Sequence, residues 1–206
     1  MNPESTTLAD YLKFFGEAPG GRVLRWQIAS GHEDRVAILE EALNDCYSRL
    51  VDGRKIDAKQ GENQLSKQVA QMLSFGGIAA RNEQEVNGHC DIVVEGNGGF
   101  MWLGEAKVHD GYKWLHDGFS QLSTRYGTAM FGRDHGELII YFRGGEAVNV
   151  LEEWKTRLLA SDSAILLSED IARPNLFFRT THICQNSGHE FHVRHSIVPL
   201  AHDPKK

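Results

Sequence analysis

The chain is poor in the features that mark secreted and membrane-bound proteins. It has three cysteines in 206 residues, at positions 46, 90 and 184. An odd, widely spaced set does not fit a disulfide framework, so a reducing compartment is favoured. No apolar run reaches the length of a membrane span, and the N-terminus is polar rather than a hydrophobic leader. We therefore expect a cytoplasmic protein with no membrane partner.

Positively charged residues are also fewer than negatively charged ones. The formal net charge is -6, from 22 Lys and Arg against 28 Asp and Glu. This balance argues against a strong, non-specific polycationic mode of DNA binding. It leaves nucleic acid open as a substrate, because a local patch can be basic and metal ions offset acids at a site. It favours help from dimerisation, from a partner subunit or from a restricted substrate.

The length suits one domain with a substantial core, and the apolar and charged fractions are those of a globular protein. We predict a single domain over residues 1–206. Within it we distinguish an N-terminal extension over 1–56, a core over 61–143, and a C-terminal helix and hairpin over 147–206.

The extension shows helix and turn signals. Residues 5–16 predict a short capped helix that ends at a glycine. Residues 19–21, Pro-Gly-Gly, predict a turn, and residues 23–28 predict a short strand. The apolar spacing over 33–51 predicts an amphipathic helix that stops at a polar stretch.

The rest of the chain alternates helical and strand patterns. The core predicts, in order, a helix over 61–75, strands over 78–86, 90–95 and 100–108, a helix over 113–127 and a strand over 137–143. A helix over 147–159 and a hairpin of strands over 176–183 and 190–198 follow, and the hairpin either extends the sheet or covers its edge. The expected fold class is α/β with a mixed central sheet.

Charged residues interrupt two of the apolar strands. Asp91 opens one strand, and Glu105 and Lys107 lie two residues apart on the next. Side chains alternate along a strand, so Glu105 and Lys107 share one face and Ala106 points to the other. Such charges are costly in a sheet unless they meet a partner or a metal ion. Two carboxylates suit a hard cation such as Mg²⁺, and a lysine beside it can orient or deprotonate water or steady a negative charge.

This pattern resembles the PD-(D/E)xK nuclease superfamily, which has the restriction-endonuclease-like fold. The residues that carry the resemblance are Asp91 and Glu105-Ala106-Lys107, with Cys90 in place of the family's usual proline. The order helix, three strands, helix, strand is similar to the αβββαβ core of that fold. The resemblance implies Mg²⁺, with Mn²⁺ as a substitute, held by Asp91, Glu105 and the carbonyl of Ala106, and Lys107 as the catalytic lysine. The alternative is strand-end acids paired with lysines.

Two further residues enter through the same resemblance. Glu62 opens the helix before the first core strand, where similar nucleases place a metal-facing acid that supports a two-metal mechanism. The alternative is a first-turn glutamate favoured by the helix dipole. Gln121 is similar to the glutamine of a family Gln-x-x-x-Tyr motif, but Arg125 occupies the tyrosine's place and Tyr126 follows one residue later. We expect Gln121 near the site, and core packing is the alternative for Tyr126.

Other polar residues are weaker candidates. For His109, Lys113 and His116 the alternatives are contact with phosphate and simple solvation. Arg125 and Arg133 are candidates for lining a DNA groove. A zinc site is conceivable near the C-terminus from His182, Cys184, His189, His192 and His195, but their spacing matches no common zinc pattern. We expect instead histidines on a half-exposed hairpin, with His192 and His195 on opposite faces. Contact of His182 or His195 with nucleic acid is a further alternative.

The resemblance implies a Mg²⁺-dependent nuclease, with a DNA endonuclease of the restriction or antiviral-defence type favoured. The implied partner is nucleic acid, with DNA favoured, and the chain would act as a homodimer or as a subunit of a larger complex. The alternative is a non-catalytic nucleic-acid-binding or assembly subunit on the same scaffold. A hydrolase of small phosphate esters finds no support, because the chain has no Gly-rich phosphate loop.

Overall fold

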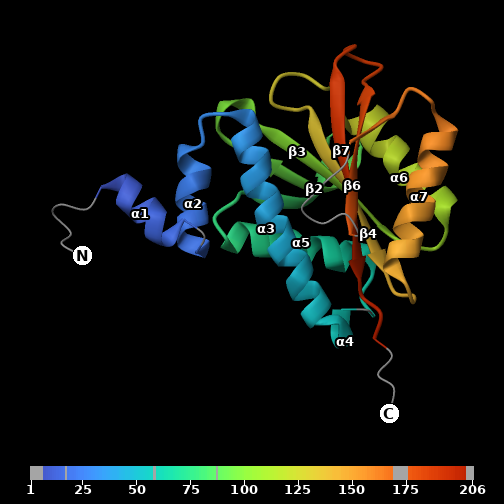
Figure 1. The fold of residues 1–206 in the computed structure, drawn as a ribbon, viewed down its shortest axis with the longest axis horizontal. Coiled ribbons are helices and arrows are strands. Elements are labelled where there is room, and N and C mark those ends of the chain that lie inside the picture. The colour runs from blue at the N-terminus through green and yellow to red at the C-terminus, as the bar shows by residue number, and fades with distance from the viewer. Residues whose placement is uncertain (1–6, 17, 58, 87, 169–175, 203–206) are drawn as a thin grey trace.

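The N-terminal third of the chain is helical. The computed structural model describes residues 7–16, 18–57, 59–86, 88–168 and 176–202. Its first elements are α1 (Leu8–Phe15), α2 (Pro19–Ile28), α3 (His32–Asp52), α4 (Arg54–Asp57) and α5 (Glu62–Phe75) (Figure 1). As predicted, α1 is capped by Thr7 and is followed by Gly16, and α3 carries the amphipathic pattern.

An open, mixed sheet follows the helices. Its strands are β1 (Ala80–Glu85), β2 (His89–Glu95), β3 (Met101–Val108), β4 (His135–Phe142), β5 (Leu166–Ser168), β6 (Phe177–Ile183) and β7 (Glu190–Pro199). In the described part of the chain these seven strands lie in the order β1-β2-β3-β4-β7-β6-β5. The pairs β3–β4 and β4–β7 are parallel and the other pairs are antiparallel. The protein is therefore an α/β protein whose sheet has a parallel centre and antiparallel flanks.

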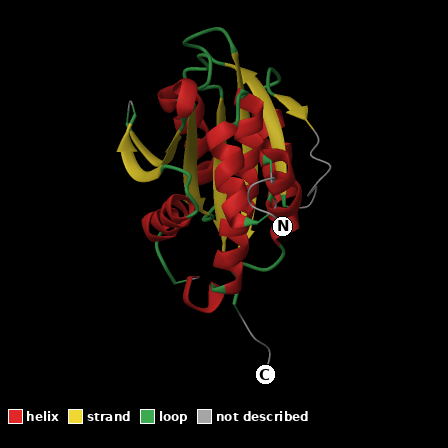
Figure 2. Cartoon of the chain, turned by 90° about the vertical axis from the view of Figure 1, so that its left-hand side faces the viewer, coloured by secondary structure: helices red, strands yellow, loops and turns green. Residues whose placement is uncertain are grey.

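Helices cover both faces of this sheet. Figure 1 shows α3 and α5 on one face, and α6 (Tyr112–Ser120) and α7 (Ala147–Ser161) on the other. Figure 2, turned by 90°, shows helices packed in front of the strands. The residues of β3 and β4 are buried almost throughout. A strand covered on both faces reads as a nearly continuous apolar run, and this is the sequence character of Leu138–Phe142 in β4.

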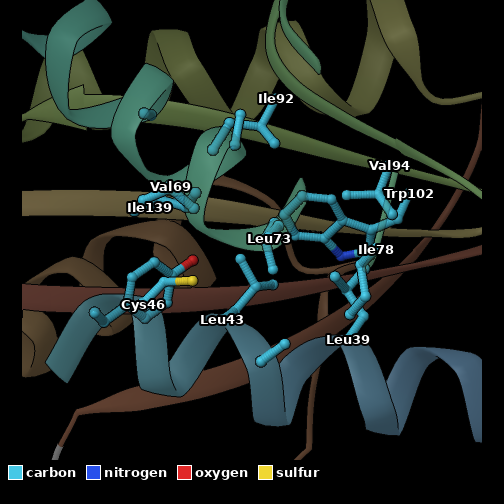
Figure 3. Close-up of a cluster of buried hydrophobic side chains, with 14 of the residues drawn as sticks. Leu39, Leu43, Cys46, Val69, Leu73, Ile78, Ile92, Val94, Trp102 and Ile139 are labelled. Carbon is cyan, nitrogen blue, oxygen red and sulfur yellow. The ribbon is translucent and has the colours of Figure 1, made fainter. Parts of the chain in front are cut away.

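The first core lies between α3, α5 and the sheet (Figure 3). Leu39 and Leu43 of α3 have no exposed surface, and they face a sheet surface that includes Trp102 and Ile139. Each fully buried side chain of this kind stabilises the fold by about 1.5–3 kcal/mol relative to exposure. The second core lies on the other face, where Leu115 of α6 and Trp154 of α7 pack on Leu103 and Leu138.

One predicted strand and one predicted turn are wrong. Residues 19–28 form the helix α2, with a proline in its first turn, where a missing N–H costs nothing. Trp26 is buried edge-on against the ring of Phe100 at 5.4 Å, and the guanidinium of Arg25 pairs with Glu41 of α3. These long-range contacts hold a helix that the short apolar pattern did not reveal.

The C-terminal hairpin is confirmed, and its second strand enters the sheet. β6 and β7 pair antiparallel, and β7 lies beside β4 in the parallel part of the sheet. The hairpin thus extends the sheet, and the three-residue strand β5, which the sequence did not predict, pairs with β6 at the edge. In the described segments, no helix combines the length and the apolar character needed to cross a membrane.

Candidate functional site

The candidate site is centred on β3, in the middle of the sheet. Glu105 and Lys107 are 2% and 5% exposed. They share a face with Leu103, toward α6, while Ala106 packs into the core on the opposite face. The predicted alternation along this strand is therefore confirmed. A carboxylate and an ammonium in a central strand are expensive to bury, so the groups around them decide what they do.

The ammonium of Lys107 joins two acids. Its Nζ lies 2.6 Å from Oε1 of Glu105 and 3.6 Å from Oε1 of Glu62. The other carboxylate oxygen of Glu62 accepts the backbone N–H of Val108 at 2.8 Å. The first residue of α5 is thereby attached to the end of β3, 46 residues further along the chain.

Asp91 is attached to the same strand from the other side. Its Oδ2 accepts the backbone N–H of Ala106 at 2.8 Å, and the side chain of Asn82 donates to its backbone oxygen at 2.9 Å. The side chain of Asp91 thus lies beside the Glu105-Ala106-Lys107 segment.

The three acids outnumber the one ammonium, and the pKa values show the imbalance. Burial raises the pKa of Asp91 to about 6, although the N–H of Ala106 opposes this shift. Burial, together with the charge of Asp91, raises the pKa of Glu105 to about 7. Burial by itself would lower the pKa of Lys107, but the surrounding acids, Glu105 foremost, raise it above its ordinary value. Lys107 is thus a stable ammonium, and the two carboxyl groups lack positive charge.

These residues fit a divalent cation. Within the described part of the chain, Oε2 of Glu105 is buried without a hydrogen-bond partner. A buried carboxylate oxygen without a donor is costly, and a cation would supply what the protein does not. Oxygen ligands from Asp91 and Glu105 suit Mg²⁺ or Mn²⁺.

Five predicted site residues therefore converge, namely Glu62, Asp91, Glu105, Ala106 and Lys107. Gln121 lies at the end of α6, where the helix continues as a π-helical turn, Gln121–Tyr126. The predicted contact of Gln121 with the site stays a prediction. The side chain of Tyr126 lies outside the part of the chain that the structure describes.

Two residues of α6 belong to the site and were not predicted. Lys107 Nζ lies 5.1 Å from the ring centre of Trp114, a cation–π distance. Gly118, one turn later, faces the stem of Lys107, since a Cβ there would lie 2.9 Å from Cγ and Cε of the lysine. A glycine inside a helical pattern costs about 1 kcal/mol relative to alanine and indicates close packing, which was the available signal.

On the nuclease hypothesis from the sequence, Gly118→Ala should therefore impair DNA cleavage more than stability. The new methyl group would displace the lysine stem, and a misplacement of about 1 Å lowers the rate of a positioned reaction by about 10–100-fold. The gain in helix propensity offsets part of the crowding, so the free energy of unfolding should change by no more than about 2 kcal/mol. The measurements are DNA cleavage and urea unfolding. Gly20→Ala is the matched control, because its Cβ would meet nothing closer than 3.8 Å. Equal cleavage by both variants would show that Gly118 does not position Lys107.

Glu105→Gln should stabilise the metal-free protein at neutral pH. The pKa of Glu105 is higher in the folded state, so the folded wild type binds a proton that the unfolded chain has already released. Below pH 4 the wild type and the variant should therefore have the same free energy of unfolding. As the pH rises toward about 7, the wild type should become less stable than the variant, and above that pH the difference should stay at about 1–3 kcal/mol. Urea unfolding in EDTA from pH 4 to 8 measures this, with the exposed Glu152→Gln as control. A pH-independent difference would contradict the raised pKa.

The remaining candidates divide by exposure. Lys113, His116, Arg125 and Arg133 are exposed, so the predictions made for them stay predictions.

The prediction of a half-exposed histidine is wrong for His195, which is fully buried and stacked on Phe178 at 4.4 Å, with Trp154 Nε1 donating to it. Its pKa is lowered by burial to about 3, and it has no surface for nucleic acid. His192 and His195 do lie on opposite faces, toward α3 and α7.

Comparisons with protein-family models, with curated proteins and with solved structures find no match to this chain.

Proposed function

We propose that this protein is a metal-dependent nuclease of the PD-(D/E)xK type, most simply a DNA endonuclease of the restriction or antiviral-defence kind. The observation that carries the proposal is the buried Glu105–Lys107 pair on the central strand, with Asp91 and Glu62 converging on it. A buried ion pair contributes little to stability compared with apolar side chains of similar volume. Titratable groups with shifted pKa values that gather at one place mark functional sites.

The order of elements supports the same proposal. The succession α5-β1-β2-β3-α6-β4 is similar to the αβββαβ core of the restriction-endonuclease-like fold. Asp91 falls on its second strand, and Glu105 and Lys107 fall on its third, where that family keeps its site.

In this proposal the acids hold Mg²⁺, with the carbonyl of Ala106 as a further ligand and Glu62 as the acid for a second ion. The ion, when bound, polarises the phosphoryl group and lowers the pKa of water. Lys107 acts as a cation rather than as a base, because its pKa is raised and it keeps its proton. Its ammonium is placed to orient the attacking water and to stabilise negative charge that develops on the phosphate oxygens. Trp114 and Gly118 limit where the ammonium can go.

The test is cleavage of supercoiled plasmid, linear duplex and single-stranded DNA by the purified protein in Mg²⁺, Mn²⁺ or EDTA. We expect cleavage that requires the metal and is lost in Asp91→Asn. Glu95→Gln is the matched control, because Glu95 lies on the same strand but at the other end, where it pairs with Arg81. An inactive wild type that also binds no Mg²⁺ in calorimetry would overturn the proposal.

One observation favours a second candidate, a non-catalytic nucleic-acid-binding or assembly subunit. The ammonium of Lys107 already neutralises part of the charge of Glu105 and Glu62 without a metal. A scaffold of this kind would bind DNA or a partner subunit and show no cleavage in any metal. Binding of DNA by wild type and Asp91→Asn alike, without cleavage, would support it.

A further inference from the structure

A second cluster of titratable side chains lies where α3 begins and β4 begins. We call it the α3–β4 histidine cluster, and it comprises His32, Glu33, Asp134 and His135. His135 pairs in register with Trp102 of β3, whereas Lys107 pairs with Ile140. The cluster is thus five residues away along β4, about 17 Å at the rise of a strand, and lies at the opposite end of the sheet from the acids of the candidate site.

Three potential ligand atoms of this cluster form a tight triangle. His32 Nε2 lies 3.1 Å from His135 Nδ1 and 2.6 Å from Oδ1 of Asp134. His135 Nδ1 lies 3.0 Å from the same carboxylate oxygen. In a tetrahedral zinc site with bonds of about 2.0–2.2 Å, ligand atoms lie about 3.3 Å apart. The triangle therefore needs to widen by only a few tenths of an ångström to become one face of such a site.

The group outside His135 also suits a metal. A histidine ligand usually donates its second ring N–H to a carboxylate, which fixes the tautomer. Oε2 of Glu33 lies 3.8 Å from Nε2 of His135 and can take this role. One nitrogen or oxygen atom from each of His32, Glu33 and His135 lies within 4.8 Å of the others, so Glu33 is close enough to support the site.

The cluster is also accessible. A cavity of about 260 Å³ opens beside it and is lined by Glu33, His135 and His192, among others. The side chains of His32 and His135 themselves are only 12% and 13% exposed. The cavity provides an entry path and room for a water molecule as the fourth ligand, the arrangement of zinc sites with three protein ligands.

We propose that the α3–β4 histidine cluster binds a divalent transition metal ion of the zinc class through His32 Nε2, His135 Nδ1 and Asp134 Oδ1. Two imidazoles and one carboxylate form a donor set that suits zinc and its neighbours rather than Mg²⁺. In the metal-free protein Asp134 can accept an N–H from each ring, so the ion replaces two hydrogen bonds. The bound ion links α3 to β4 across 103 residues of chain. The proposal is independent of nuclease activity.

The experiment measures Zn²⁺ binding to the full chain in an Asp91→Asn background, which weakens the other acidic site. After treatment with a chelator, Zn²⁺ is titrated by competition with a chromophoric chelator. We expect one equivalent with a Kd below about 1 µM. His32→Ala and His135→Ala should weaken binding at least 100-fold, and Glu33→Gln by about 10–100-fold. The exposed His189→Ala is the matched control and should bind as the parent does.

Folding is controlled in two ways. Asp134→Asn keeps the shape of the side chain, and circular dichroism reports whether each variant is folded. The absorption spectrum of the Co²⁺ form and X-ray absorption of the Zn²⁺ form of the parent protein identify histidine ligands without any further substitution. If the parent protein does not bind one equivalent of Zn²⁺ tightly, the proposal is overturned. So would tight binding that survives in both His32→Ala and His135→Ala, or a metal spectrum without histidine ligands.

Discussion

On the proposed nuclease function, Lys107→Met is expected to lower the rate of metal-dependent DNA cleavage by about 10²–10⁴-fold. The reason is the loss of the one ammonium that the structure holds between Glu105 and Glu62. A positioned charge or proton donor at a reacting phosphate contributes a factor of this size. Methionine keeps most of the stem that packs on Gly118, so the effect isolates the charge.

Metal binding should respond in the opposite direction. Without Lys107 the carboxylates of Asp91 and Glu105 lose a neighbouring positive charge, so the site becomes more negative and should bind Mg²⁺ at least as well at pH 8. Calorimetry with Mg²⁺ and a plasmid-cleavage time course make the comparison. Lys67→Met is the matched control, since Lys67 is an exposed lysine of α5. A Lys107→Met protein that cleaves as fast as the control would remove the lysine from the mechanism.

Arg194→Met is expected to produce the largest loss of stability, about 3–5 kcal/mol in the free energy of unfolding. The guanidinium is 2% exposed and lies between β7 and α3. Its Nη2 donates to Asn44 at 2.6 Å, and its Nε lies 3.6 Å from the fully buried Glu137. Its Nη1 lies 3.7 Å from Glu40. Removing the arginine leaves a buried carboxyl group without its cation.

A double variant separates charge from packing. Arg194→Met combined with Glu137→Gln removes both charges and keeps the hydrogen-bonding shape that Tyr47 OH meets at 2.9 Å. We expect it to recover a large part of the lost stability, because a buried pair replaced as a whole costs far less than one broken by half. Urea unfolding of the wild type, the single and the double variant gives the coupling energy. A single variant within about 1 kcal/mol of the wild type would show that the arginine is dispensable.

The charge clusters on the two faces of this sheet differ in a way that bears on function. On the α3 face, Arg194 lies between Glu40 and Glu137, and Arg179 also pairs with Glu40. On the α6 face, Lys107 lies among three acids of the described part of the chain, Asp91, Glu105 and Glu62. In the first cluster, guanidinium groups pair with both carboxylates and link α3 to the sheet. The second leaves an excess of negative charge, and this is the property that a cation site requires.

The sequence predicted the elements whose patterns are long or distinctive. The helices α3 and α5 carry an apolar stripe over several turns, and β4 ends in a continuous apolar run, Leu138–Phe142, so periodicity and length were enough. It failed for α2, where the apolar residues are few and a buried Trp26 and an Arg25–Glu41 pair decide the conformation. Short segments have weak local preferences, and tertiary contacts override them.

For the candidate site, the sequence by itself determined that Glu105 and Lys107 share one face of a strand, because alternation is a property of the extended backbone. Only the tertiary structure decided which groups meet them. Glu62 reaches Lys107 because α5 packs with its first turn at the end of β3, and Gly118 reaches it because α6 covers that face. The same holds for His32 and His135, which no sequence pattern joins. Burial by the whole fold, which sequence spacing does not encode, then raises the pKa values of Asp91 and Glu105.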